Sequence, residues 1–178
     1  TQLHAEIEEY IQTQEIPENA SDLFGAWYSS VNEKGVAFLA QEMLVYHPYL
    51  LYGGTLDAIG DVDGVTTLFD WKTTDEYRIA RDEQGKVKRL ANGMPKTQRK
   101  KFNDNIAYAV QLGGYMSALR MMEGHNIIPQ QAYIVYVFKD TKRVHWELVN
   151  LDAAERVFAS CANLNNNLTS SKKGGLYE

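Results

Sequence analysis

The sequence has 178 residues, 44% of them hydrophobic, and a formal net charge of −5. This length and apolar content fit one domain over residues 1–178 with a buried core. No apolar run approaches the roughly 18 residues of a membrane span, and no secretory signal is visible, so we expect no membrane partner. The single cysteine, Cys161, excludes an internal disulfide and a four-cysteine iron–sulfur cluster. We therefore expect the cytosol or another reducing compartment.

Two helices are predicted at the start of the chain. Apolar residues recur at helical spacing to about residue 14, and Pro17 then ends this helix. Asn19 or Ser21 can cap a second helix that continues to about residue 32. Its apolar positions are predicted to lie in the core: Leu23, Phe24, Trp27 and Val31.

Three strands are predicted next. The first lies between Gly35 and His47, and it contains Glu42 among apolar residues. From the pattern alone, Glu42 can be a surface residue of an edge strand. The next two strands occupy residues 52–74 and are separated by the sequence Asp61-Val62-Asp63-Gly64, which is typical of a hairpin turn.

Charged residues interrupt both strands of this hairpin. Asp57 lies on the first strand, and Asp70 and Lys72 lie on the second. Because side chains alternate along a strand, Asp70 and Lys72 share one face while Phe69 and Trp71 point to the other. Burying an isolated carboxylate costs several kcal/mol. Asp70 is therefore paired with Lys72 in a structural ion pair, or protonated, or it faces a cleft where a cation or ligand compensates its charge.

A cleft that holds a cation would suit a particular reaction. Two neighbouring carboxylates repel each other, and Mg²⁺ relieves this repulsion by binding one or two of them together with water and phosphate oxygens. A protonated Lys72 is no ligand, but it can orient or deprotonate an attacking water, or neutralise charge in the transition state. The pattern predicts metal-assisted hydrolysis of a phosphodiester.

A basic segment follows at about residues 75–102. Between residues 78 and 101 there are nine basic and two acidic residues, which gives +7, whereas the rest of the chain sums to −12. Gly85, Gly93 and Pro95 favour a hairpin or arch over a helix. The segment is either a solvated loop or a surface that binds nucleic-acid phosphates. The candidate phosphate-binding residues are Arg78, Arg81, Lys88, Arg89, Lys96, Arg99, Lys100 and Lys101.

A long helix is predicted after the basic segment. Asn103 or Asp104 can cap it, and it is expected to run to residue 122. Gln111 and Tyr115 are four residues apart and therefore share one face of this helix.

Two strands and a helix complete the chain. Residues 132–139 are apolar throughout and should form a central strand, whereas residues 143–150 alternate and should lie nearer an edge, with His145 facing outward. The last helix is expected from Asp152 to about residue 168, before a frayed tail. Its inward positions are expected to be Ala154, Val157, Phe158, Cys161 and Leu164.

In their order and spacing these residues resemble the PD-(D/E)xK nucleases, and within them the RecB-like exonucleases, a branch that includes mitochondrial genome-maintenance exonucleases and many phage nucleases. The resemblance runs along most of the chain, and each motif is weak by itself. The residues that carry it are His4 in LHAEIEEYI, Glu42 in AQEMLVYH, Asp57 in GGTLDAIG, Asp70 and Lys72 in FDWKTT, and Gln111 and Tyr115 in QLGGY.

The resemblance implies an α/β, restriction-endonuclease-like fold with a mixed sheet flanked by helices, and further sequence before Thr1. It implies a metal-dependent DNA exonuclease that prefers single-stranded ends and acts in DNA repair, recombination or replication. The implied ligands of Mg²⁺ or Mn²⁺ are His4, Asp57, Asp70 and the carbonyl of Trp71. In the same resemblance Lys72 acts on the water, Glu42 joins the acidic cluster, and Gln111 and Tyr115 support the lysine or contact the DNA backbone.

Three alternatives stay open. An endonuclease of the same fold would cut at a structure or short sequence. A non-catalytic nucleic-acid-binding domain could have kept the fold. A carboxylate-based glycoside hydrolase would also need two acids, but it would gain nothing from Lys72 or the basic segment.

Overall fold

A computed structural model describes residues 1–101 and 106–173, with side chains as far as residue 166. Its main feature is a five-stranded mixed sheet in the order β1-β2-β3-β6-β7. Neighbouring strands are antiparallel except β3 and β6, which run parallel. β6 is therefore central and β7 lies at an edge, as the sequence predicted. The strands are β1 (Ala37–His47), β2 (Tyr52–Val62), β3 (Val65–Thr74), β6 (Gln131–Phe138) and β7 (Val144–Val149).

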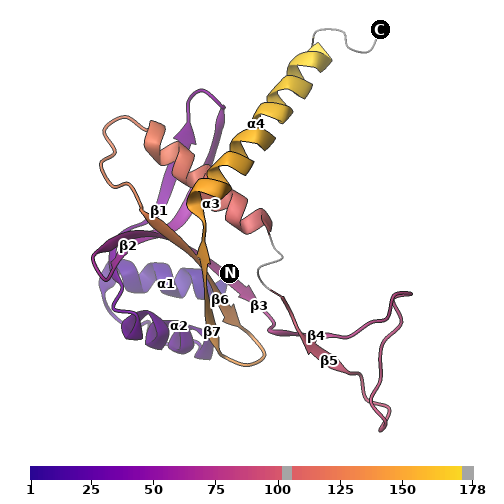
Figure 1. Ribbon diagram of the computed structural model, residues 1–178. Helices are drawn as coiled ribbons and strands as arrows, with labels where there is room; N and C mark the ends of the chain where they lie inside the picture. Colours follow the sequence, from indigo (N-terminus) through magenta and orange to yellow (C-terminus); the bar gives the residue numbers. More distant parts are fainter. Residues whose placement is uncertain (102–105, 174–178) are drawn as a thin grey trace.

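Helices cover both faces of this sheet (Figure 1). α1 and α2 pack on the face that carries Trp71, and Trp27 of α2 meets the Trp71 ring edge-on. α3 packs on the face that carries Leu68, and α4 crosses α3. This is the helix-flanked mixed sheet that we expected. The helices are α1 (Gln2–Thr13), α2 (Asp22–Glu33), α3 (Ile106–Met121) and α4 (Leu151–Lys173).

The start of α2 shows how a buried acid organises the first two helices. Ser21 is the N-cap, and its hydroxyl accepts a hydrogen bond from the backbone of Phe24 at 3.2 Å. The Ser21 hydroxyl and backbone N–H donate in turn to the carboxylate of Glu6, at 2.7 and 3.0 Å. Glu6 is buried because these donors replace its water, and the pair ties α1 to α2.

The turn between β2 and β3 has the predicted form. Asp63 and Gly64 form a two-residue connection with φ of 54° and 80°. Positive φ at both central positions suits the twist of a hairpin, and glycine adopts it without strain. The Asp61 carboxylate accepts from the Gly64 backbone at 2.7 Å and closes the turn.

The last helix departs from expectation. Ala154 is buried where α4 crosses α3, but Val157, Cys161 and Leu164 are exposed. The prediction that these three residues point into the core, with Cys161 as a core filler, is wrong. Figure 1 shows that α4 continues past the sheet and past α3, which leaves its later turns without cover. Val157 instead borders an apolar cavity beside α3. The helix also extends to Lys173, beyond the predicted end near residue 168.

Smaller points complete the fold. Asn103 and Asp104, the predicted caps of α3, lie outside the described residues. His145 was expected on the surface; it is half-buried, with its Nε2 3.0 Å from the Glu147 carboxylate. None of the described helices has the length and apolar character that crossing a bilayer demands.

Candidate active site

The candidate acids lie where β2 and β3 separate. The ladder between these strands begins at Val62 and Val65 and ends at Ala58 and Phe69. At the next position along β2, a side chain replaces the backbone as hydrogen-bond acceptor. Oδ2 of Asp57 accepts a hydrogen bond from the Trp71 N–H at 2.7 Å. A side chain thus satisfies the first backbone donor that the separated strands leave without a ladder partner.

Asp70 and Lys72 form the ion pair that the sequence raised as one interpretation. Lys72 Nζ lies 2.6 Å from Asp70 Oδ2, and the two side chains are 21% and 3% exposed. Burial raises the pKa of Asp70 to about 6, although Lys72 pulls this pKa down; the nearby charge of Asp57 raises it further. One lysine therefore does not fully compensate the buried carboxylate.

His4 reaches the same place from α1. Its Nε2 lies 3.0 Å from the carbonyl oxygen of Trp71 and 3.8 Å from Oδ2 of Asp57, and its Nδ1 contacts the Thr1 hydroxyl. Burial lowers the pKa of His4, while Asp57 opposes this effect. The imidazole is therefore shifted toward its neutral form, which is the form that binds metal ions.

Glu42 faces Asp57 across the β1–β2 pair. The flanking pairs Gln41–Ala58 and Met43–Leu56 set this register, and the backbone of Glu42 has a positive φ of 43°. Burial raises the pKa of Glu42, and the charges of Asp57 and Glu8 raise it further. Glu42 is thus part of the acidic cluster. Glu8 is a neighbour that the sequence analysis did not include.

Gln111 and Tyr115 border the acids from α3. Gln111 Nε2 donates to the Tyr115 hydroxyl at 2.8 Å. Burial raises the pKa of Tyr115, and the charges of Asp70, Asp57 and Glu42 add to this rise. Gly54 permits the approach, because a Cβ built there would lie 2.8 Å from the Tyr115 ring.

The ring of Tyr108 lies beside Lys72. Lys72 Nζ lies 4.7 Å from the centre of this ring, within the range of a cation–π interaction. The sequence analysis missed Tyr108, although it precedes Gln111 by three residues and Tyr115 by seven and so shares their face of α3. That spacing was the signal that could have found it.

The basic segment forms a separate arm, which we call the basic arm (residues 77–101). Two short strands, β4 (Tyr77–Ile79) and β5 (Thr97–Arg99), pair at its root. Beyond them, the backbones of Ala80, Lys88 and Lys96 bond one another in a ring of three hydrogen bonds of 2.8–2.9 Å. Figure 1 shows the arm extending away from the sheet after β3, so the predicted hairpin is present and carries two smaller turns.

Two predicted phosphate-binding arginines hold these turns. Arg81 donates to the Gly85 carbonyl at 2.8 Å, and Arg89 donates to the Gly93 carbonyl at 2.7 Å. Both side chains are exposed, and so are the other arginines and lysines of the arm except the half-buried Lys100. The arm therefore presents an exposed positive surface.

The root of the arm is fixed by Glu76, a buried acid that the sequence analysis did not identify. Its carboxylate accepts hydrogen bonds from Arg143, through Nε at 3.0 Å and through Nη2, and from the Thr141 hydroxyl at 2.8 Å. It also forms an ion pair with Arg99, whose Nε lies 2.8 Å from Oε1. These hydrogen bonds lower the pKa of Glu76, with the Arg143 contact first. The Asp140 carboxylate accepts from the Glu76 backbone at 2.8 Å. Arg99 thus has a structural partner.

Two lysines at the end of the basic arm lie near Lys72. Lys100 Nζ donates to the Thr74 hydroxyl at 3.1 Å. Lys100 and Lys101 line a cavity of about 190 Å³ together with Lys72, and rings from α3 and β6 close it. Of the predicted phosphate-binding residues, these two lie beside the candidate lysine. The cavity is lined by Lys72, Thr73, Thr74, Lys100, Lys101, Tyr108 and Tyr136.

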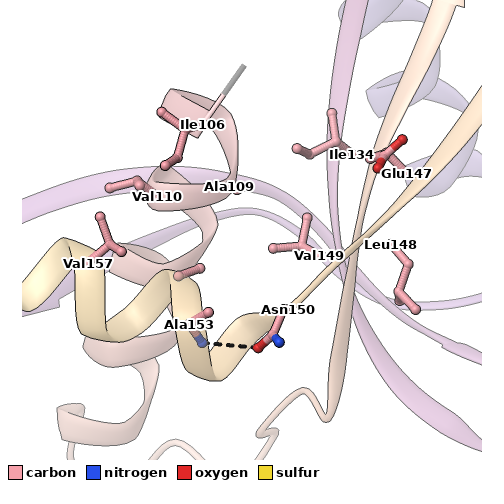
Figure 2. A pocket seen from close by; sticks show the side chains of 11 residues that line it. Ile106, Ala109, Val110, Ile134, Glu147, Leu148, Val149, Asn150, Ala153 and Val157 are labelled. Carbon is pink, nitrogen blue, oxygen red and sulfur yellow. Dashed lines mark hydrogen bonds between the residues drawn. The ribbon is translucent and has the colours of Figure 1, made fainter. Parts of the chain in front are cut away.

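A larger apolar cavity lies elsewhere. It measures about 290 Å³ and is enclosed by β7 and the first turns of α3 and α4 (Figure 2). Figure 2 shows Ile106, Val110, Leu148 and Val157 around it, with Glu147 as its charged residue. None of the candidate site residues lines this cavity, so its size does not make it the site.

The acidic cluster is not arranged as a ready metal cage. In residues 1–101 and 106–173, no three His, Cys, Asp or Glu side chains lie close enough to hold one ion. Asp70 instead turns to Lys72, and Asp57 bonds the Trp71 backbone. The groups that converge are one imidazole nitrogen, one carboxylate oxygen and one backbone carbonyl oxygen, from His4, Asp57 and Trp71.

No family model matches the sequence, and no curated protein matches it. Among solved structures, the chain is similar to a protein from Eubacterium rectale that has been proposed to be an exonuclease, with a TM-score of 0.54 at 14% identity. The likeness covers 99% of this chain and 68% of that protein. An alkaline exonuclease from Laribacter hongkongensis aligns over 98% of this chain and 85% of its own at 12% identity, but the TM-score of 0.30 is too low to indicate a shared fold. The chain therefore has the fold of the Eubacterium rectale protein.

Proposed function

We propose that this chain is a metal-dependent deoxyribonuclease of the PD-(D/E)xK superfamily, in its RecB-like branch, which degrades DNA from free single-stranded ends. The observation that carries the proposal is the separation of β2 and β3, which gathers Asp57, Asp70 and Lys72 beside an exposed basic arm. The fold shared with a protein proposed to be an exonuclease supports it. DNA repair, recombination or replication is the setting that such an activity serves.

The donor set fits a divalent cation. On an octahedron with bonds of about 2.1 Å, adjacent ligands lie about 3 Å apart. His4 Nε2 and the Trp71 carbonyl oxygen are 3.0 Å apart, and His4 Nε2 and Asp57 Oδ2 are 3.8 Å apart. Carboxylate and carbonyl oxygens suit Mg²⁺ and Mn²⁺, and the imidazole nitrogen favours Mn²⁺. We propose His4, Asp57 and the Trp71 carbonyl as ligands. Asp70, which faces Lys72 in this structure, would have to turn from it to become a fourth.

The raised pKa of Asp70 supports its place in this set. A carboxylate whose pKa is about 6 beside a lysine lacks positive charge, and a divalent cation would supply it. When bound, such a cation would polarise the phosphodiester and promote ionisation of a bound water. The Asp57–Trp71 hydrogen bond would meanwhile hold the Trp71 peptide with its carbonyl toward His4.

Lys72 is the group proposed to act on the reacting atoms. Asp70 at 2.6 Å and the Tyr108 ring at 4.7 Å restrict the position of its Nζ. From this position Lys72 can orient the attacking water and neutralise charge as it develops on the phosphate, which favours the transition state over the ground state. Tyr115, held by Gln111, borders the acids and can donate to a phosphate oxygen.

The basic arm is proposed to bind the DNA backbone. Lys100 and Lys101 would contact phosphates next to the scissile bond, because they share a cavity with Lys72. The exposed residues further out would contact more distant phosphates. These contacts are electrostatic and independent of sequence, so affinity should fall as salt rises.

The proposal is tested by digesting end-labelled single-stranded, duplex and circular single-stranded DNA with Mg²⁺ or Mn²⁺. We expect mononucleotides or short products from linear single strands and little loss of circles. Cutting of circles at a rate equal to that of linear strands would show an endonuclease. Binding without cleavage in either metal would show a binding domain that keeps the fold.

A further inference from the structure

The tip of the β1–β2 hairpin carries an exposed apolar surface that the proposed chemistry does not use. We call residues 43–56 the outer hairpin; this segment contains no Asp, Glu, Lys or Arg. Four of its large side chains are mostly exposed: Leu44 (74%), Tyr46 (54%), Tyr49 (79%) and Leu51 (86%). Single exposed apolar residues are ordinary, but four in one short hairpin mark an interaction surface.

These side chains are exposed because the strand pair changes face at the acids. Before the change, Gln41 donates to the Glu8 carbonyl of α1 at 3.2 Å. After it, Met43 and Val45 pack into the core on the α3 side. Leu44 and Tyr46 must then point to the opposite side. Figure 1 shows the outer hairpin rising beyond α1 and α2, so neither helix covers that side.

Tyr46 has an open flank. Its partner across the pair is Gly53, which has no side chain to lie beside the ring. A Cβ built on Gly53 would lie 3.8 Å from Tyr46 Cβ and 3.1 Å from the Val45 carbonyl oxygen, so this position is already close-packed at the backbone level. Any other residue at position 53 would also place a side chain beside Tyr46, whereas glycine leaves that side of the ring free for a flat group.

The outer hairpin is continuous with the acidic cluster. Tyr46 follows Glu42 by four residues on β1, a distance of about 13 Å at roughly 3.3 Å per residue. Gly53 precedes Asp57 by the same number on β2. The basic arm leaves the cluster in the other direction, from the end of β3 (Figure 1). The acids thus lie between a charged surface and an uncharged aromatic one.

We propose that the outer hairpin is a stacking surface for the unpaired bases of a single DNA strand, with Tyr46 and Tyr49 providing the rings. Bases have apolar faces that stack on aromatic side chains, and only a single strand leaves those faces free. A surface without charge gives phosphates no partner, so it fits bases better than backbone. The proposal rests on the proposed function for its place beside the cleavage site, and it assigns the preference for single strands to the outer hairpin.

Binding can be measured without cleavage, with a fluorescently labelled single-stranded oligonucleotide in EDTA, by anisotropy over a range of salt. Tyr46→Ala and Tyr49→Ala should each raise Kd about tenfold, because both rings stack on bases. The slope of log Kd against log salt should stay unchanged, since no phosphate contact is lost. Tyr46→Phe and Tyr49→Phe keep the rings and should stay within about twofold of wild type. Ile16→Ala, which removes an exposed apolar residue from another surface, is the matched control.

An abasic site moved along the oligonucleotide gives the decisive test. In wild type, loss of one particular base should weaken binding about tenfold; in Tyr46→Ala the same loss should cost little, because its partner is gone. Additive effects at every position would overturn the proposal. So would unchanged Kd in the alanine variants, or a change in self-association without a change in Kd, which would make the surface a contact between copies. If the abasic site and Tyr46→Ala affect Kd non-additively but wild type cleaves no DNA, the stacking surface is supported and the proposed nuclease function is wrong.

Discussion

Asp70→Asn should make the metal-free protein more stable while it destroys activity. The pKa of Asp70 is about 6 in the folded chain against an ordinary 3.8. Above both values this difference corresponds to about 3 kcal/mol of destabilisation, which asparagine removes. Part of the gain is lost because Lys72 loses its partner. We therefore expect a net gain of about 1–2 kcal/mol at pH 7 in EDTA, or a rise in Tm of roughly 3–6 °C.

The stability difference between wild type and Asp70→Asn should depend on pH. A raised folded-state pKa means that folded Asp70 holds its proton more tightly than the unfolded chain does. Wild type should therefore lose stability relative to Asp70→Asn as the pH rises from about 3.8 to about 6, with no further loss above, and the gap between them should narrow toward pH 3.8. Urea unfolding of both proteins across this range measures the difference. The matched control is Asp75→Asn, which changes an exposed aspartate and should leave the free energy of unfolding as in wild type across this pH range.

The activity of the same variant should fall at least about a thousandfold, roughly 4 kcal/mol of transition-state stabilisation, if Asp70 is a ligand. A variant that is less stable at pH 7 would show that Asp70 and Lys72 form a stabilising ion pair. Cleavage within tenfold of wild type would remove Asp70 from the mechanism.

Three further predictions concern the surroundings of the acids. Glu76→Gln should loosen the basic arm, seen as faster proteolysis within it and a higher KM with little change in kcat, and equal proteolysis would contradict this. Lys100→Ala with Lys101→Ala should flatten the salt slope on single strands by about 1.4, because two phosphate contacts are lost; an unchanged slope would mean that these lysines bind no phosphate. His4→Ala should weaken activation by Mn²⁺ more than activation by Mg²⁺, since imidazole favours Mn²⁺. Equal losses of activation in titrations with the two metals would argue against His4 as a metal ligand.

The parts of the fold that depend on local pattern could be predicted from the sequence. Alternation along β3 put Asp70 and Lys72 on one face and Phe69 and Trp71 on the other, and the stacking of these two rings confirms it. The turn at Asp63 followed from its composition, because both turn positions need positive φ. Such features are determined within a few residues.

The parts that depend on distant neighbours could not be predicted. Glu76 is buried through partners 65 and 67 residues away, so its own surroundings in the sequence resemble an ordinary surface turn. The change of face at Glu42 follows from an unusual backbone conformation that no periodicity reveals. The apolar positions of α4 were recognised, but their exposure depends on how far the packing between α3 and α4 continues, and Leu164 is 62% exposed.

The most direct test of the central claim is the single-turnover rate of Lys72→Ala on linear single-stranded DNA with saturating Mn²⁺. Lys34→Ala is the matched control, because Lys34 also lies over aromatic rings, at 5.5 and 5.6 Å from their centres, and is not one of the candidate site residues. We predict that Lys72→Ala binds DNA and metal as wild type does but cleaves at least about a thousandfold more slowly, that Lys72→Arg recovers little, and that Lys34→Ala is unchanged. A Lys72→Ala protein that binds DNA more weakly yet cleaves bound DNA at the wild-type rate would contradict the account.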